Sequence, residues 1–312
     1  MAKVIVSGSL AFDRIMDYHG QFGEHFVADK MHSINLSFLV DKLSVEFGGT
    51  AGNIAYNLAL LGETPEIIST AGTDFGPYRA HLLLSGIDPK SIKLLDGELT
   101  ASAVVFTDSA DNQISAFHPG AGKFPYDTPV ETEGRALAIV APGNIDDMTA
   151  LPAYYRRKGV RYLYDPGQQI TALSGEQLKD GISGAHTLFA SDYEFGLIAQ
   201  KTGWTADSIL EHVKNLVVTY GAKGSQVFTK EGVAKVESAP VKNDEDPTGA
   251  GDAYRAGFIK GMILALPVES CAKIGSVAAA YAVETYGTQT HHFTVEEFKE
   301  RYKDTYSEKA DF

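Results

Sequence analysis

Residues 246–257, DPTGAGDAYRAG, place two reactive features within one short segment. Because Thr248 is a good helix N-cap residue, we expect Gly249 to Asp252 to form the first turn of a helix. Backbone N–H groups in a first turn lack intrahelical partners and can bind phosphate oxygens. The groups concerned are those of Gly249, Ala250 and Gly251. The Asp252 carboxylate could accept a proton from a hydroxyl at the same place, so the segment predicts phosphoryl transfer to an alcohol. The alternative is a glycine-rich helix start with no chemistry.

The residues around this turn carry a family resemblance. The string DPTGAGDA closely resembles the signature of the ribokinase family of small-molecule kinases, the PfkB-type carbohydrate kinases. A second motif of that family, a Gly-Gly pair in the first third of the chain, is present in FGGTAGN at 47–53. The resemblance extends over residues 7–289 and is greatest to the prokaryotic nucleoside kinases of the adenosine and inosine-guanosine kind.

The composition narrows the class of protein. A formal net charge of −13 argues against nonspecific binding to nucleic acid or to an anionic membrane. The single cysteine, Cys271, leaves no intramolecular disulfide and no cysteine-rich metal site. The N-terminus enters a strand directly, and no apolar run has membrane-spanning length. We therefore expect a cytoplasmic protein. The sequence leaves open whether it is a monomer or a homodimer.

Short buried-type strands alternate with amphipathic stretches along most of the chain. This alternation predicts an α/β fold with a mostly parallel central sheet and helices on both faces. The predicted strands are 4–8, 67–71, 138–141, 162–165, 187–190 and 216–219. The family resemblance implies the same ribokinase-like fold.

Two segments depart from this pattern and predict a separate small β-sheet. Residues 14–45 contain short alternating and aromatic pieces, such as 15–18 and 34–40. Residues 102–117 predict a hairpin that turns at 108–112. We expect residues 14–45 and 98–119 to form a small β lid. The large domain is then formed by 1–13, 46–97 and 120–312. The resemblance implies that the lid covers the substrate and keeps water away from the transferred phosphoryl group.

The substrate side of the site is predicted from strand ends and the glycine pair. Asp13 follows the first strand, where open α/β sheets bind ligands, and its carboxylate could accept hydrogen bonds from two vicinal hydroxyls. A loop-capping role is the alternative for Asp13. By resemblance, Gly48, Gly49 and Asn53 hold a ribose, and we expect lid aromatics such as Phe38 and Phe117 to flank a base.

The nucleotide side is predicted mainly by resemblance. The resemblance implies that the loop at the end of residues 216–219 contacts the phosphate donor through Thr219, Gly221 and Gly224. It also implies that Thr248 and Ala279 border the nucleotide. A plain turn between strands is the alternative for that loop. Relatives carry Asn-x-x-Glu where this chain has Ser191 and Glu194, so Glu194 remains the residue expected to organise Mg²⁺ through water. The loop 286–289 resembles one that, with backbone near Asp246, binds a monovalent cation such as K⁺ in some relatives.

The expected activity is phosphorylation of the 5′-hydroxyl of a nucleoside by ATP and Mg²⁺. Adenosine is the nucleoside expected first. Asp252 is the expected base. Two alternatives stay open: a ribokinase- or fructokinase-like sugar kinase, and a nucleoside-binding sensor with weakened catalysis, suggested by Ser191. Arg14, beside Asp13, has no role in this scheme and could recognise an anionic group.

Overall fold

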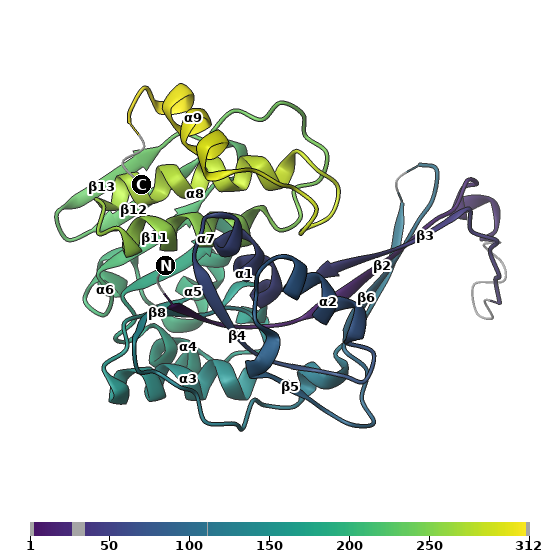
Figure 1. Cartoon of the computed structure of the whole chain (residues 1–312), viewed down its shortest axis with the longest axis horizontal. Coiled ribbons are helices and arrows are strands. Elements are labelled where there is room, and N and C mark those ends of the chain that lie inside the picture. The colour runs from purple at the N-terminus through teal and green to yellow at the C-terminus, as the bar shows by residue number, and fades with distance from the viewer. Residues whose placement is uncertain (1–2, 27–34, 111, 310–312) are drawn as a thin grey trace.

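The computed structural model describes residues 3–26, 35–110 and 112–309. Two sheets organise these residues, a large one inside the body of the molecule and a small one that projects from it (Figure 1). The predicted α/β class and the small additional sheet are both confirmed.

The large sheet is mostly parallel. In the described residues its spatial order is β13-β12-β11-β10-β9-β8-β1-β4-β5, and only the β11–β12 and β12–β13 pairs are antiparallel. The strands are β1 (Lys3–Ser7), β4 (Thr64–Ala71), β5 (Ile92–Leu94), β8 (Arg135–Val140), β9 (Tyr162–Tyr164), β10 (Thr187–Ser191), β11 (Asn215–Thr219), β12 (Ser225–Thr229) and β13 (Gly232–Val236). The chain passes from β1 to β4 on one side and returns to β8 on the other. Loops therefore diverge between β1 and β8, where open α/β sheets bind ligands.

Helices cover both faces because alternate residues of a strand point to opposite sides. In β1, Val4 and Val6 pack into the core beneath α1, α2, α7 and α8, whereas Ile5 packs into the core beneath α3 to α6. The first group comprises α1 (Thr50–Leu60), α2 (Gly76–Leu84), α7 (Ala250–Ile263) and α8 (Val268–Val283). The second comprises α3 (Ile145–Lys158), α4 (Gly175–Ile182), α5 (Asp192–Thr202) and α6 (Ala206–Leu210). The last helix, α9 (Val295–Tyr306), packs on α8.

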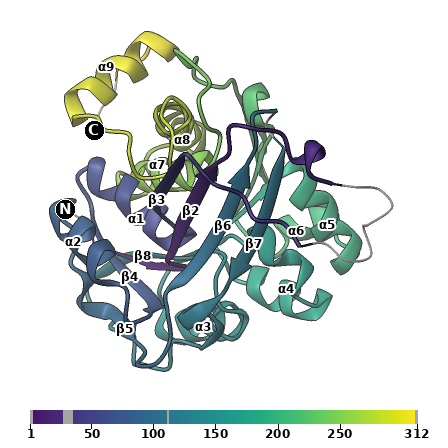
Figure 2. The same cartoon turned by 90° about the vertical axis from the view of Figure 1, so that its right-hand side faces the viewer.

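The small sheet has the order β3-β2-β6-β7 (Figure 2). Its strands are β2 (Ala11–Asp17), β3 (Lys42–Gly48), β6 (Ala101–Thr107) and β7 (Gln113–His118). The predicted hairpin over 102–117 is the antiparallel pair β6–β7. No strand forms in the described part of 34–40, because the strand that pairs with β2 is Lys42–Gly48 instead.

This pairing bears on the predicted domain boundaries. Residues 13 and 46 form one register pair of β2 and β3, so the boundaries after 13 and before 46 fall inside two strands of the small sheet. The division into a large domain and a lid remains a proposal, and its edges are best placed at Ala11 and Gly48. In the described residues, no helix is long and apolar enough to cross a membrane.

Candidate active site

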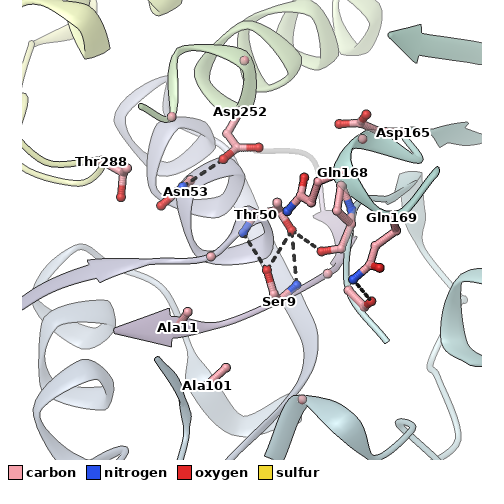
Figure 3. Close-up of a pocket in the computed structure, with 18 of the residues that line it drawn as sticks. Ser9, Ala11, Thr50, Asn53, Ala101, Asp165, Gln168, Gln169, Asp252 and Thr288 are labelled. Atoms are coloured by element: carbon pink, nitrogen blue, oxygen red, sulfur yellow. Dashed lines mark hydrogen bonds between the residues drawn. The ribbon is translucent and has the colours of Figure 1, made fainter. Parts of the chain in front are cut away.

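A cleft of about 630 Å³ opens at the carboxyl ends of the parallel strands. Its walls come from residues at or just after the carboxyl ends of β1, β4, β8, β9, β10 and β11, from the starts of α1 and α7, and from the small sheet. In Figure 3, Asn53 and Asp252 point toward one another, while Asp165 and Gln168 lie on the opposite side of the space. The fold thus joins in one place many of the residues singled out in the sequence.

The glycine-rich turn begins α7, but one residue later than predicted. Gly249, not Thr248, is the N-cap residue, with a φ of 79° that L side chains rarely adopt. The N–H of Ala250 donates to the Pro247 carbonyl at 3.2 Å, so it is less available than predicted. The N–H groups of Gly251 and Asp252 lie in the first turn without intrahelical partners and could bind an anion, so we refer to them as the anion seat.

Asp252 lines the cleft and contacts Asn53. The Asn53 Nδ2 donates to Asp252 Oδ2 at 2.8 Å (Figure 3). Burial raises the pKa of Asp252 to about 7, the Asn53 hydrogen bond and the Arg255 charge oppose this rise, and Asp165 and Glu194 add to it. A carboxylate with a pKa near neutrality is well suited to accept a proton from an alcohol.

A buried ion pair lies directly below the anion seat, and sequence reasoning gave it no role. Arg255 is 6% exposed and donates from Nε and Nη2 to the Asp165 carboxylate at 2.6 and 3.1 Å. Its Nη1 donates to the Gly251 carbonyl at 3.0 Å. A Cβ at Gly251 would lie 2.9 Å from that nitrogen, so glycine gives the guanidinium its place. Both charged residues line the cleft.

Asp13 lies on β2, on the face of the small sheet that lines the cleft. Its pKa is raised to about 6, first by burial and then by the charges of Asp246 and Glu46. Arg14 points to the other side, where its Nε donates to Ser102 Oγ at 3.1 Å and its Nη2 lies 3.8 Å from Asp74 Oδ2. Arg14 is therefore not a ligand group of this cleft.

The glycine pair marks the passage from β3 into α1. Gly49 lines the cleft and is the N-cap residue of α1 with a φ of 89°. Gly48 does not line the cleft; its carbonyl accepts from the Tyr78 hydroxyl at 2.8 Å. A Cβ on Gly48 would clash with the Asp13 carboxylate, so this glycine leaves room for Asp13. Asn53 follows within the first turns of α1, where it reaches Asp252.

The predicted nucleotide residues separate into two groups. Thr219 and Thr248 line the cleft. Gly221, Gly224 and Ala279 do not: Gly224 packs against the end of β13, and Ala279 packs on the core beneath α8. Gly221 and Gly224 belong to the turn after β11, which leads back into β12, whereas Ala279 lies on α8.

Ser191 and Glu194 form a capping box at the start of α5. The Glu194 N–H donates to Ser191 Oγ at 3.2 Å, and the Ser191 N–H donates to Glu194 Oε2 at 2.7 Å. Ser191 thus has a structural role, because it caps the start of α5. Both residues line the cleft. In the described residues, no group of three or more His, Cys, Asp or Glu side chains could hold a metal ion.

The two predicted aromatic residues lie far apart. Phe117 lines the cleft and is 62% exposed. Phe38 does not line it; its ring packs among Tyr18, Phe22 and Phe106, with centroid distances between 5.0 and 5.5 Å. The expectation that Phe38 flanks a base therefore does not fit this structure, because its partly buried ring contacts other rings of the small sheet and of the segment before it.

Further polar residues in the cleft were missed by sequence reasoning. Asn144 and Asp147 follow β8, and Gln168 and Gln169 follow β9. Their position directly after two predicted parallel strands was an available signal. Asn144 caps α3, and Gln169 Nε2 donates to the Gly143 carbonyl at 3.0 Å, which fixes that loop.

Comparison with known proteins agrees with this geometry. Residues 1–294 match the sequence profile described as pfkB family carbohydrate kinase. A nucleoside kinase of Methanothermobacter thermautotrophicus is 32% identical over 294 residues, covering 92% of this chain and 91% of that protein. The Burkholderia thailandensis nucleoside kinase in complex with inosine superposes with a TM-score of 0.85 at 32% identity, covering 98% of this chain and 99% of that one. The Methanocaldococcus jannaschii nucleoside kinase superposes with a TM-score of 0.88 at 29% identity, covering 97% and 99%.

Proposed function

The chain belongs to the pfkB family of carbohydrate kinases, enzymes that transfer a phosphoryl group to an alcohol, and from this premise we propose that its substrates are ATP and a nucleoside. The acceptor is the 5′-hydroxyl. Adenosine is the nucleoside that we propose first, and inosine, which the Burkholderia thailandensis enzyme holds in its complex, is the second.

One observation carries the proposal: the 2.8 Å hydrogen bond between Asn53 and Asp252. A ribose held by Asp13 and Asn53 through its vicinal hydroxyls would place its 5′-hydroxyl near Asp252. Asp252 then accepts the hydroxyl proton while the oxygen attacks the γ-phosphorus, the bond to the bridging oxygen breaks and ADP leaves. The N–H groups of Gly251 and Asp252 stabilise the charge on the phosphoryl oxygens.

The charges of the cleft favour a nucleoside over a sugar phosphate. Among the described residues that line it, the only basic side chain is Arg255, and Asp165 already pairs with it. A phosphorylated sugar would therefore meet carboxylates without a free cationic partner. Phe117 offers an apolar ring that could contact a nucleobase.

Two ions belong to the same proposal. Glu194 would hold Mg²⁺ through water, and this ion supplies charge neutralisation between the β- and γ-phosphates when it is bound. Gly287 N–H donates to Asp246 Oδ2 at 3.1 Å, which places the loop 286–289 against Asp246. Backbone carbonyls there are the oxygen ligands that a monovalent cation such as K⁺ would take.

The test is ATP consumption by the purified protein with adenosine, inosine, guanosine, cytidine, ribose or fructose 6-phosphate as acceptor. We expect the largest kcat/KM with a purine nucleoside. Activity confined to ribose or fructose 6-phosphate would establish the sugar-kinase alternative. Tight adenosine binding without ATP consumption would instead establish a sensor.

A further inference from the structure

We infer that Gln289 is a positioning residue for phosphoryl transfer, which acts by holding the Asn53 amide in the orientation that donates to Asp252. The inference rests on the proposed role of Asp252 as the base. Gln289 is 4% exposed and lies in the segment between α8 and α9, far from both Asn53 and Asp252 in the sequence.

The side-chain amide of Gln289 connects three buried groups. Its Nε2 donates to Asn53 Oδ1 at 2.9 Å and to the Tyr78 hydroxyl at 2.7 Å. Its Oε1 lies 3.0 Å from His81 Nε2. Because a carbonyl oxygen can only accept, His81 carries its proton on Nε2 and donates to Gln289. Every hydrogen-bonding group of the Gln289 side chain is thus used.

The direction of each bond follows from its neighbours. The Tyr78 hydroxyl donates to the Gly48 carbonyl at 2.8 Å, so it must accept from Gln289. The Asn53 oxygen accepts from Gln289, which leaves the Asn53 NH₂ facing Asp252. If the Asn53 amide were flipped, its NH₂ would face another NH₂ and its oxygen would face a carboxylate. Gln289 therefore determines which end of Asn53 meets the base.

This orientation controls the charge on Asp252. The NH₂ of Asn53 is the strongest of the groups that oppose the rise of the Asp252 pKa caused by burial. Arg255, one turn along α7, also lowers this pKa, whereas Asp165 at the end of β9 and Glu194 on α5 raise it. Once Gln289 no longer holds Asn53, the donor is lost and more of the base is protonated at neutral pH.

The same segment also contacts the end of β3. Thr288 Oγ1 donates to the Phe47 carbonyl at 2.8 Å, and His81 stacks on the Phe47 ring at a centroid distance of 4.4 Å. The hydrogen bonds that orient the base thus share partners with the junction between the small sheet and α1. Gln289 is well placed to make orientation of the base depend on the position of that junction.

The test uses single-turnover phosphoryl transfer to adenosine between pH 6 and pH 9. For Gln289→Leu, which keeps the side-chain size, we expect the rate at pH 7 to fall roughly 10-fold, as for loss of a hydrogen bond to a charged group. The rate should return to within about 2-fold of the wild-type rate at pH 9, where Asp252 is ionised in both proteins. His81→Phe retains the ring on Phe47 and should show a smaller loss with the same recovery.

A matched control distinguishes a general loss of stability from a loss of Asn53 positioning. Tyr56 lies on α1, the helix that carries Asn53. Tyr56→Phe removes the hydrogen bond from the Tyr56 hydroxyl to the His291 carbonyl (2.6 Å) but leaves the bonds to Asn53 intact. It should lower the melting temperature without changing the pH profile. A Gln289→Leu protein that does not fold leaves the decision to His81→Phe.

The outcomes distinguish this inference from the proposed function. Losses of equal size at every pH in Gln289→Leu and His81→Phe, or wild-type profiles in both, would overturn the positioning role. If Asp252→Asn keeps wild-type turnover, the assignment of the base is wrong and the inference fails with it. Inactive Asp252→Asn together with wild-type profiles in the other two variants removes the inference alone.

Discussion

Helix α7 and the small sheet contribute to the same cleft but are supported very differently. Along α7 the side chains from Ala253 to Ile259 are buried, and Arg255 is paired with Asp165 beneath the anion seat. In the small sheet every residue of β7 is exposed, and the sheet projects from the body (Figure 1). The proposed base thus lies on a rigid, closely packed element, whereas Asp13 and Phe117 lie on a thin one. Chemistry and substrate recognition should therefore respond differently to substitution.

Asp252→Asn should have the largest effect on activity. It should also change how the stability of the protein depends on pH. We expect kcat to fall roughly 10²–10⁴-fold, with little change in KM, because the general base is lost. The raised pKa means that the folded state binds a proton more tightly than the unfolded chain between about pH 4 and pH 7. Wild-type stability should therefore fall as the pH rises through this range, and the fall should be smaller in the variant, which keeps only the other carboxyls of raised pKa, such as Asp13. Steady-state kinetics and urea unfolding at pH 5 and pH 8 check both points.

Arg255→Met should be the most destabilising substitution in the cleft. It leaves Asp165 buried without its partner, which costs about 3–5 kcal/mol. The matched control is Arg14→Met on the small sheet, where the side chain is 38% exposed and 3.8 Å from Asp74. That variant should change the free energy of unfolding by less than about 1 kcal/mol. Equal losses in urea unfolding would remove the contrast between the two regions.

Asp13→Asn should weaken nucleoside use while leaving the protein folded. We expect kcat/KM for the nucleoside to fall roughly 10–100-fold, because hydrogen bonds to an ionised carboxylate are lost. In the wild-type protein kcat/KM should fall more steeply below pH 6 than in the variant, since protonation of Asp13 there adds to that of Asp252. Asp17→Asn, on the same strand but outside the cleft lining, is the control and should keep wild-type kinetics.

Phe117→Ala should give the smallest effect. The ring is 62% exposed, so the melting temperature should change little, while KM for the nucleoside rises roughly 3–10-fold through lost contact with the base. Ile114→Ala is the control, because Ile114 lies on the same strand outside the cleft lining and is 48% exposed. An unchanged KM in Phe117→Ala would show that Phe117 on the small sheet does not contact the nucleobase.

The main sheet was predictable from the sequence because its strands are continuous apolar runs. Such runs fix both the strand and its burial on two faces, and Asp13, Asn53 and Asp252 could be placed from the motifs at their ends. The small sheet was harder. Residues 34–40 are more apolar than Lys42–Gly48, yet the latter form β3, because they pair with β2. That pairing depends on tertiary contacts that no local pattern contains.

Two details of the site could not be predicted from the sequence, each for a different reason. Thr248 is the better N-cap residue by type, but Gly249 takes that place because the turn requires a positive φ. The contacts of Gln289 join residues that are far apart in the sequence, and glutamine alone predicts no particular partner. Long-range polar contacts of this kind become visible only in the folded chain.

The route of the chain between the two sheets has a consequence for how this architecture can arise. Strand β1 of the large sheet is followed at once by β2 of the small one, and β2 pairs in parallel with β6, which enters only after β4, α2 and β5 have been made. The projecting sheet is therefore no insertion that one recombination event could add or remove. Grafting it onto another protein would require two separate transplants in correct register, and both halves must emerge from the ribosome before it can assemble.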